Sequence, residues 1–325
     1  MLLAIVLAVA LTFVTVEAPR ALDRLVDRLS GVPHFHPVSE PELIEEFMRS
    51  NYMTLIGYAC LSAVILLIIA GLITERTVLA SAGAIAFFLP SFGHFAVHMF
   101  FLAGLGILRV LWLPFWGDPM KLGGIAYLPY MIVVYPLALV HVDVSGYVPL
   151  LVIGLGFMVF LLAEVAWLYG KLLRKGTVDL WLYRFSRHPQ YLGWLVWSYG
   201  LMLSASQQAP ARGGQNPGLG LPWLICSLVI ICVALAEEIK MGRERGDEYA
   251  AYRAATPFML PLPRLVSTMI TMPMRAVLKK DRPENAKELL ITFGIYLAIL
   301  LLLSVPFLLL DAPKYGWWAW PRIFS

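Results

Sequence analysis

From Ser50 to Thr74 the sequence reads SNYMTLIGYACLSAVILLIIAGLIT, and no Asp, Glu, Lys or Arg interrupts it. A helix needs about 20 mostly apolar residues to cross the hydrocarbon core of a bilayer. A helix also satisfies its own backbone hydrogen bonds, as a segment surrounded by lipid must. Glu75 and Arg76 follow at once and end the run. This stretch therefore predicts a transmembrane helix.

Charge-free stretches recur along the whole chain. The others are 1–16, 77–108, 122–142, 144–163, 188–211, 213–236 and 289–310. All but the first are long enough to span, and none is a roughly 10-residue alternating segment typical of a transmembrane β-strand. The 325-residue chain is 60% hydrophobic and only 14% charged, whereas soluble domains have about 25% charged residues. We predict an all-α, polytopic transmembrane protein of about eight helices, or nine if Pro90-Ser91-Phe92-Gly93 divides its stretch.

Three regions are expected. Residues 1–150 form an N-terminal region with the first four helices; its first segment lacks the charged start of a signal peptide and is expected to be retained. Residues 151–265 form the core, with the densest polar chemistry of the chain. Residues 266–325 combine a basic surface segment with the last transmembrane helix.

The placement of lysine and arginine predicts the orientation in the membrane. Ten of these residues lie in 239–287 and five in 170–187, whereas the stretch 207–220 has only Arg212. Both basic stretches are therefore expected in the cytoplasm. With eight helices, both chain termini would lie outside and residues 17–49 inside. An amphipathic surface helix is expected within that segment, at about Ala21 to Leu29.

Metal, disulfide and nucleic-acid chemistry are not expected. His94 and His98 are four residues apart, as metal ligands on one helix face can be, but no second histidine cluster accompanies them. Cys60, Cys226 and Cys232 lie in apolar stretches without a CxxC motif. The net charge of +4 suits loops beside anionic membrane lipids better than a nucleic-acid surface.

Polar residues concentrate between 183 and 257. The sequence reads RHPQYLGW from Arg187 to Trp194, and Glu237-Glu238 follow after an apolar hairpin. Proline is tolerated in the first turn of a helix, and the residue before it avoids the α conformation, so a helix should begin at Pro189. Its free N–H groups favour an anion there. The hairpin should bring the two glutamates to this helix start, although about 45 residues separate them.

These residues resemble a known family. Arg187-His188-Pro189-Gln190-Tyr191-Leu192-Gly193 followed by Glu237-Glu238 looks like the motif of the isoprenylcysteine carboxyl methyltransferase family. Related patterns occur in phospholipid methyltransferases and in membrane sterol reductases. Tyr249, Tyr252 and Pro257 fit the shared C-terminal pattern. The resemblance covers about residues 170–265 and leaves out 1–150 and the last helix.

The resemblance implies an integral membrane methyltransferase that uses S-adenosylmethionine and takes a lipophilic substrate from the bilayer. The acceptor would be the carboxylate of an isoprenylcysteine-like compound. Carried over by position, the catalytic residues would be Arg187, His188 and Glu238. The cofactor would be bound by Tyr183, Arg187, His188, Pro189, Tyr191, Gly193, Glu237 and Glu238, with no metal ion. Aromatic faces of Tyr183, Tyr191 and Trp194 would suit a sulfonium.

Other interpretations stay open. An NADPH-dependent sterol or enone reductase is the related alternative, although Gln190 and Trp194 depart from the motif common in that branch. A catalytically silent scaffold or lipid carrier is the alternative from another class. Residue by residue, Glu237-Glu238 could mark a helix end and Arg187 could be a cytoplasmic anchor. Glu164 could line the same pocket or pair with Arg109.

Overall fold

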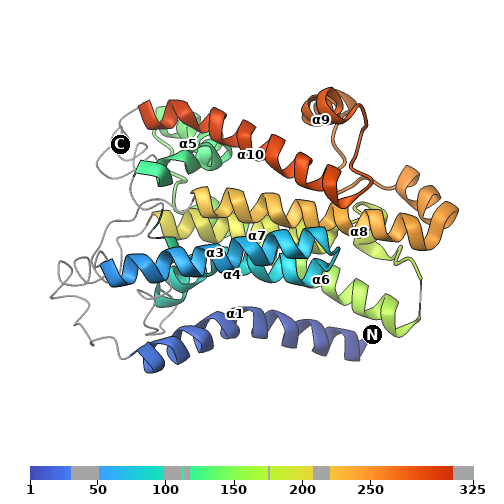
Figure 1. Ribbon diagram of the computed structural model, residues 1–325, viewed down its shortest axis with the longest axis horizontal. Coiled ribbons are helices and arrows are strands. Elements are labelled where there is room, and N and C mark those ends of the chain that lie inside the picture. Colours follow the sequence, from blue (N-terminus) through green and yellow to red (C-terminus); the bar gives the residue numbers. More distant parts are fainter. Residues whose placement is uncertain are drawn as a thin grey trace.

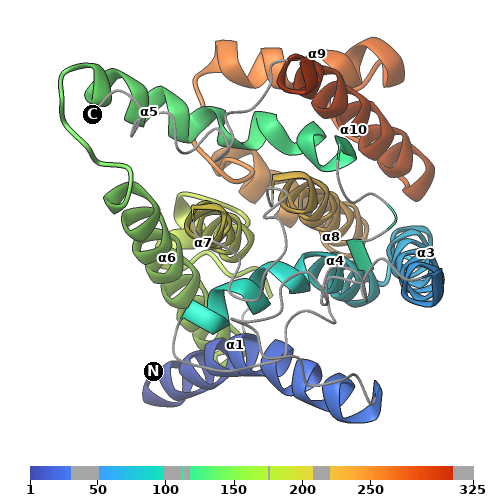
Figure 2. The same cartoon turned by 90° about the vertical axis from the view of Figure 1, so that its left-hand side faces the viewer.

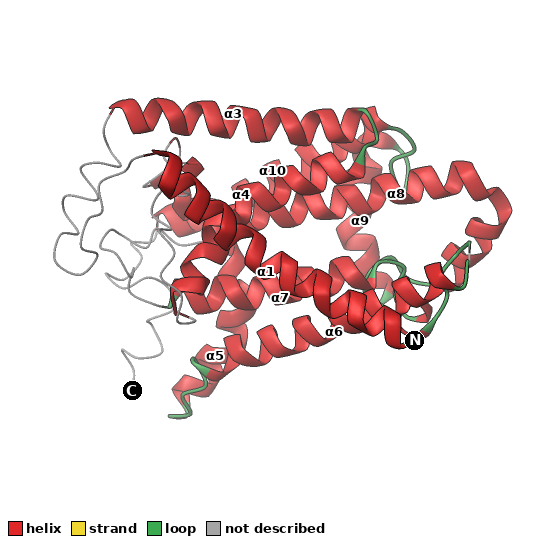
Figure 3. Cartoon of the chain, turned by 90° about the horizontal axis from the view of Figure 1, so that it is seen from below, coloured by secondary structure: helices red, strands yellow, loops and turns green. Residues whose placement is uncertain are grey.

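The computed structural model describes residues 1–30, 51–98, 111–112, 114, 118–174, 176–207 and 220–309. Every regular element in these residues is a helix, which confirms the all-α prediction for this part of the chain (Figures 1 and 3). The elements are α1 (Leu2–Ser30), α3 (Asn51–Ile73), α4 (Thr77–His98), η2 (Asp118–Tyr127), α5 (Leu128–Leu139), α6 (Tyr147–Leu172), η3 (Trp181–Arg184), α7 (Pro189–Ser206), α8 (Gly220–Ala255), α9 (Arg264–Leu278) and α10 (Ala286–Leu309).

The protein has the helices of a membrane protein. Five segments are long and apolar enough to cross a bilayer, namely Asn51–Ile73, Leu122–Leu139, Tyr147–Leu172, Gly220–Ala255 and Ala286–Phe307. Leu2–Val14 and Thr77–Phe88 are apolar but shorter. The membrane prediction is thus confirmed in its coarse form. The count of eight spanning helices stays a prediction.

The helices form one bundle in which most run along the long axis (Figure 1). Residues 173–174, 176–188 and 239–285 lie at one end, which we call the basic end. The turn between α3 and α4 lies there too, because Glu75 pairs with Arg243 of α8 at 2.6 Å. α1 begins at the same end, where Ala4 and Ala8 pack against Val165 of α6. The basic end therefore collects the loops that frame the candidate site.

η2 and α5 lie at the opposite end. Tyr127 and Ser206, the last residue of α7, share a hydrogen bond of 2.7 Å between their hydroxyls. Gln207 donates to the Tyr130 hydroxyl at 3.0 Å. In Figure 2, α3, α7 and α8 are seen end-on while α5 runs across the view. The stretch 122–142, predicted as the fourth spanning helix, thus begins and ends at the same end of the bundle.

This placement differs from the one that the predicted orientation requires. Because 122–142 does not pass from one end to the other, every element before it is inverted relative to the prediction. Met1 lies at the basic end and α10 finishes at the opposite end, so the two ends of the described chain are not on one side (Figure 1). Likewise α1 carries residues 17–30 toward the opposite end, away from 239–287. Residues 31–50 lie outside the described part.

Several helix boundaries also differ from expectation. α1 continues unbroken through the predicted surface helix, and α4 is not divided at Pro90. α8 does not end at Glu237-Glu238 but continues to Ala255, with one non-helical residue, Gly246, at φ 49° and ψ −119°. Only glycine adopts such a conformation without strain. The basic surface segment forms a helix of its own, α9, whose apolar residues gather on one face.

The site rests on the close packing of α6 and α7. A Cβ atom on Gly193 would meet the backbone of Phe160, and one on Gly156 would meet the backbone of Trp197. A Cβ on Gly200 would lie 2.6 Å from the backbone nitrogen of Ile153. Small residues of this kind allow the backbones of membrane helices to approach closely. They fix the start of α7 against α6.

Candidate functional site

The start of α7 is built as the sequence predicts. The helix begins at Pro189, and His188 before it has φ −128° and ψ 56°, outside the α region. The backbone N–H of His188 donates to the Ser186 hydroxyl at 3.3 Å, and that of Arg187 donates to the Pro257 carbonyl at 2.9 Å. The local backbone is thus tied to the segment that follows α8.

Arg187 is the centre of the polar network. Its Nε donates to Oε1 of Glu238 at 2.6 Å and its Nη2 to Oε2 at 3.2 Å. Its Nη1 donates to the carbonyls of Arg253 at 2.9 Å and Thr256 at 2.6 Å. A two-point pairing of guanidinium with carboxylate is among the strongest side-chain interactions. The predicted convergence of Arg187 with Glu238 is therefore present in the structure.

His188 joins the two glutamates. Its Nε2 lies 3.2 Å from Oε1 of Glu238, and its Nδ1 lies 3.9 Å from Oε2 of Glu237. The imidazole is 4% exposed and contacts the rings of Tyr191 and Phe258, with centroid distances of 5.7 and 5.2 Å. Glu238 thus accepts from both Arg187 and His188. It is satisfied within the protein.

A second group of polar residues lies beside Glu237, on the α6 and α7 side. Tyr191 donates its hydroxyl to Oε1 of Glu237 at 2.7 Å. Gln190 donates to Oε1 of Glu164 on α6 at 3.2 Å. Tyr183 is 5% exposed, and its buried hydroxyl has no hydrogen-bond partner among the described residues. We call Glu164, Tyr183, Tyr191 and Glu237 the acidic cluster.

Tyr183 interacts electrostatically with the carboxyl groups of this cluster. Burial raises the pKa of Tyr183 well above 10, and the charges of Glu164, Tyr252 and Glu237 raise it further. Its backbone carbonyl accepts a 2.7 Å hydrogen bond from the Tyr252 hydroxyl, which fixes η3 against α8. Tyr183 therefore stays a neutral hydrogen-bond donor among negative groups.

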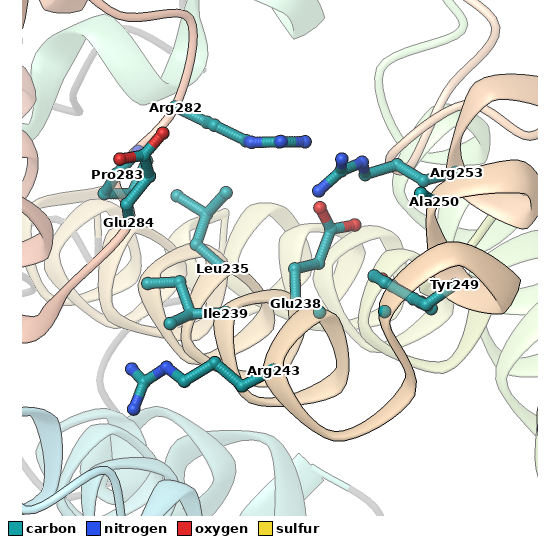
Figure 4. A pocket seen from close by; sticks show the side chains of 12 residues that line it. Leu235, Glu238, Ile239, Arg243, Tyr249, Ala250, Arg253, Arg282, Pro283 and Glu284 are labelled. Carbon is teal, nitrogen blue, oxygen red and sulfur yellow. The ribbon is translucent and has the colours of Figure 1, made fainter.

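A pocket of about 340 Å³ opens on the other side of Glu238 (Figure 4). Its walls come from α8 on both sides of Gly246 and from the linker between α9 and α10. The lining residues are Leu235, Glu238, Ile239, Gly242, Arg243, Gly246, Tyr249, Ala250, Arg253, Arg282, Pro283 and Glu284. A volume of this size suits a small ligand or a headgroup.

The other predicted site residues have structural roles or lie outside the described residues. Pro189 begins α7, and Gly193 provides the close approach to α6 rather than a free backbone surface. Trp194 is 6% exposed and packs in the core against Phe88, with ring centroids 6.2 Å apart. Among the described residues, no hydrogen bond or ring contact joins Trp194 to the acidic cluster. Arg109, the suggested partner of Glu164, lies outside the described residues.

Sequence reasoning missed Phe258 and the carbonyl acceptors at 253 and 256. Phe258 also faces Arg187, whose guanidinium carbon lies 5.8 Å from the ring centroid. No motif marks a carbonyl acceptor, because any residue supplies one. Tyr249 and Tyr252, which the motif did indicate, both lie at the site. In the described part of the chain no three His, Cys, Asp or Glu side chains are grouped as metal ligands would be.

Comparison with protein-family models, with curated proteins and with solved structures gave no significant match.

Proposed function

We propose that the protein is a membrane methyltransferase that binds S-adenosylmethionine at the acidic cluster and methylates a lipophilic acceptor. One observation carries this proposal. The hydroxyl of Tyr183 is buried without a hydrogen-bond partner among the described residues, within electrostatic range of Glu164 and Glu237, at the end of an apolar bundle. A buried polar group without a partner costs about 1–3 kcal/mol, so a ligand that satisfies it gains affinity.

The cluster suits a cationic ligand. Glu164 and Glu237 bring two carboxyl groups, and among the described residues the nearest ion-pair partner of Glu237 is Nδ1 of His188, at 3.9 Å. Tyr183 and Tyr191 add aromatic faces, which attract cations through the ring quadrupole. S-adenosylmethionine carries a sulfonium and an ammonium, so the donor set fits it. Glu164, Tyr183, Tyr191 and Glu237 would hold these groups.

Arg187, His188 and Glu238 would act as positioning residues. All three nitrogens of the Arg187 guanidinium donate to protein acceptors, and Glu238 accepts from Arg187 and His188. These side chains therefore have little hydrogen-bonding capacity left for a ligand. Their effect would be to fix Tyr191 and Glu237 relative to Tyr183. This differs from the sequence-based expectation of direct catalytic contacts.

The bound cofactor would supply a methyl group on a positively charged sulfur. An acceptor carboxylate is already ionised near neutral pH, so no strong base is required. The protein's own residues would hold the acceptor in line with the methyl group and exclude water. The apolar bundle provides the dry surroundings. We propose an isoprenylcysteine-like carboxylate as acceptor, entering from the bilayer.

The test is calorimetric titration of the purified protein in detergent with S-adenosylmethionine, its demethylated product and NADPH. The first two should bind. Tyr183→Phe and Glu237→Gln should each weaken binding at least about tenfold. Tyr147→Phe and Glu244→Gln make the same chemical changes at exposed positions and should leave binding unchanged.

Other outcomes would replace the proposal. Binding of NADPH alone would indicate a reductase. No binding of any of the three, in protein shown to be folded by its thermal transition, would indicate a scaffold or lipid carrier.

A further inference from the structure

The pocket beside Glu238 has a charge balance of its own. Two of its lining carboxylates are paired, Glu238 with Arg187 at 2.6 Å and Glu284 with Lys280 at 2.6 Å. One of its arginines, Arg243, is paired with Glu75 at 2.6 Å and points toward the turn between α3 and α4 (Figure 4). These residues contribute no unpaired charge to the pocket.

Two arginines remain. The guanidinium groups of Arg253, on α8, and Arg282, on the linker before α10, point toward one another near Glu238 (Figure 4). Neither forms an ion pair with a carboxylate of the described residues. Two neighbouring cations repel each other unless an anion lies between them. The pocket therefore contains two arginines that have no ion-pair partner among the described carboxylates.

The pocket also contains an unsatisfied donor and an apolar wall. Tyr249 is fully buried, and its hydroxyl has no hydrogen-bond partner in the part of the chain that the structure describes. Leu235 and Ile239 line the side that continues into the apolar half of α8. The ligand that matches these features has an anionic head, which accepts hydrogen bonds, and an apolar body on the bilayer side.

We infer that this pocket binds the phosphate of an anionic membrane lipid. Arginine presents a planar fork of N–H groups that suits phosphate oxygens, and two arginines with a phenol can engage three of them. The neighbouring helix α9 exposes Leu265, Met269 and Met272, and residues 275–287 are rich in Lys and Arg. Such an amphipathic, basic helix lies at the depth of lipid headgroups. This places a phosphate within reach of the pocket.

The inference does not depend on the proposed methyltransferase activity. Glu238 lines this pocket and is linked to Glu237 of the acidic cluster through His188, while the two places differ in the charged side chains that they offer. The acidic cluster suits a cation and the pocket suits an anion. Lipid binding can therefore be measured without cofactor and without any turnover.

The experiment is native mass spectrometry of the full chain in detergent, with phosphatidylglycerol, phosphatidylcholine or inorganic phosphate added. Phosphatidylglycerol should bind more tightly than phosphatidylcholine. Arg253→Ala with Arg282→Ala should weaken this binding at least about tenfold. The matched control, Lys240→Ala with Arg264→Ala, removes the same charge from exposed positions outside the pocket. It should change the binding little.

Three results would overturn the inference. An equal loss in the pocket variant and the control would mean a diffuse charge effect. Inorganic phosphate that binds as tightly as the lipid would mean a soluble anion. Displacement of the lipid by S-adenosylmethionine would assign the pocket to the cofactor. If the double variant does not fold, Arg282→Ala alone is used, because Arg282 is exposed on a linker and supports no core packing.

Discussion

Arg187 holds Glu238 at two points, with Nε 2.6 Å from Oε1 and Nη2 3.2 Å from Oε2, although the residues are 51 positions apart. Through Nη1 the same guanidinium also reaches the carbonyls of Arg253 and Thr256. One side chain thus joins the start of α7, the middle of α8 and the segment after α8. The geometry of both candidate ligand sites depends on this connection.

Replacing Arg187 by lysine should destabilise the protein despite the retained charge. An ammonium cannot reproduce the two-point contact with Glu238 together with both carbonyl bonds. The expected cost is about 1.5–3 kcal/mol, the contribution of a hydrogen bond that involves a charged group. The measurement is the thermal unfolding midpoint in detergent. Arg184→Lys is the control, since Arg184 is exposed and makes one 3.3 Å bond to a carbonyl. Equal shifts in the two variants would contradict the central role of Arg187.

Gly246→Ala should lower stability although nothing lies within 4 Å of the added Cβ. The cost arises from the backbone, because φ 49° with ψ −119° strains any L-residue by about 1–3 kcal/mol. Gly242→Ala, one turn earlier in a regular helix and equally free of contacts, should instead stabilise by about 0.5–1 kcal/mol. The sign of the difference between the two midpoints is the measurement. Shifts in the same direction would mean that the kink is not held as described.

The interface of α6 with α7 can be tested with a second pair of glycines. In Gly156→Ala the methyl group meets the backbone of Trp197, so the helices must separate, at a cost of about 1–3 kcal/mol. In Gly154→Ala the methyl group meets nothing within 4 Å, and the change should be at most about 1 kcal/mol in the stabilising direction. The measurement is the thermal unfolding midpoint of each variant relative to the wild type. A destabilised Gly154→Ala beside an unaffected Gly156→Ala would contradict the packing.

The helical class and the start of α7 could be predicted because both follow from local rules. An apolar run must be helical in a bilayer, and a proline in the first turn fixes a helix start. The contact of Arg187 and His188 with Glu237 and Glu238 followed from the hairpin alone. The length of α8 was not predicted, because a charged pair marks where a segment leaves the membrane, and a helix can continue beyond that point. Gly246 is a non-helical residue at which α8 kinks, and the helix resumes after it.

The placement of the stretch 122–142 could not be predicted for a different reason. Hydropathy tells whether a segment can cross a membrane and does not tell whether it does. Leu122–Leu139 is apolar enough to span, yet the hydrogen bonds of Tyr127 and Tyr130 hold it at the end of α7. These contacts join residues more than 70 positions apart, which no local pattern reveals. The pocket between Arg253 and Arg282 was missed likewise, since its walls come from separate elements.

Tyr183→Phe should raise stability at neutral pH and weaken the pH dependence above pH 10. The variant removes a buried hydroxyl that has no partner, which should add about 1–3 kcal/mol in the absence of ligand. Because the folded pKa is raised, the folded protein retains the proton that the unfolded chain loses above about pH 10. The wild type therefore keeps its full stability up to about pH 10 and loses part of it as the pH rises from there toward the folded pKa of Tyr183.

The measurement is the unfolding midpoint of wild type, Tyr183→Phe and Tyr147→Phe at pH 8.5 and near pH 11. Tyr147 is 69% exposed and serves as the control for loss of a phenol. Wild type and Tyr147→Phe should lose stability by the same amount over this range, and Tyr183→Phe should lose less. Equal losses in all three would show that Tyr183 ionises freely and is not buried among the carboxylates.

From the arrangement of the helices we predict which loops share one side of the membrane. This prediction differs from the one given by the placement of Lys and Arg with eight spanning helices. Glu75 and Lys240 lie at the basic end, because Arg243, close to Lys240 on α8, pairs with Glu75. Asp143 lies at the opposite end, next to Ser145, whose carbonyl accepts from Gln207 at the end of α7. Single cysteines at positions 75 and 240 should therefore react from the same side of the membrane. A cysteine at position 143 should react from the other side.

The measurement uses a membrane-impermeant maleimide on intact and on opened cells, in a variant whose native Cys60, Cys226 and Cys232 are replaced. Replacing Glu75 removes only one ion pair, between groups 33% and 53% exposed, so the fold should persist. Eight alternating spans would instead place positions 75 and 143 on one side and position 240 on the other. Labelling of 75 together with 143 would show that Leu122–Leu139 crosses the membrane, and the placement of α5 across the end of the bundle would then be wrong.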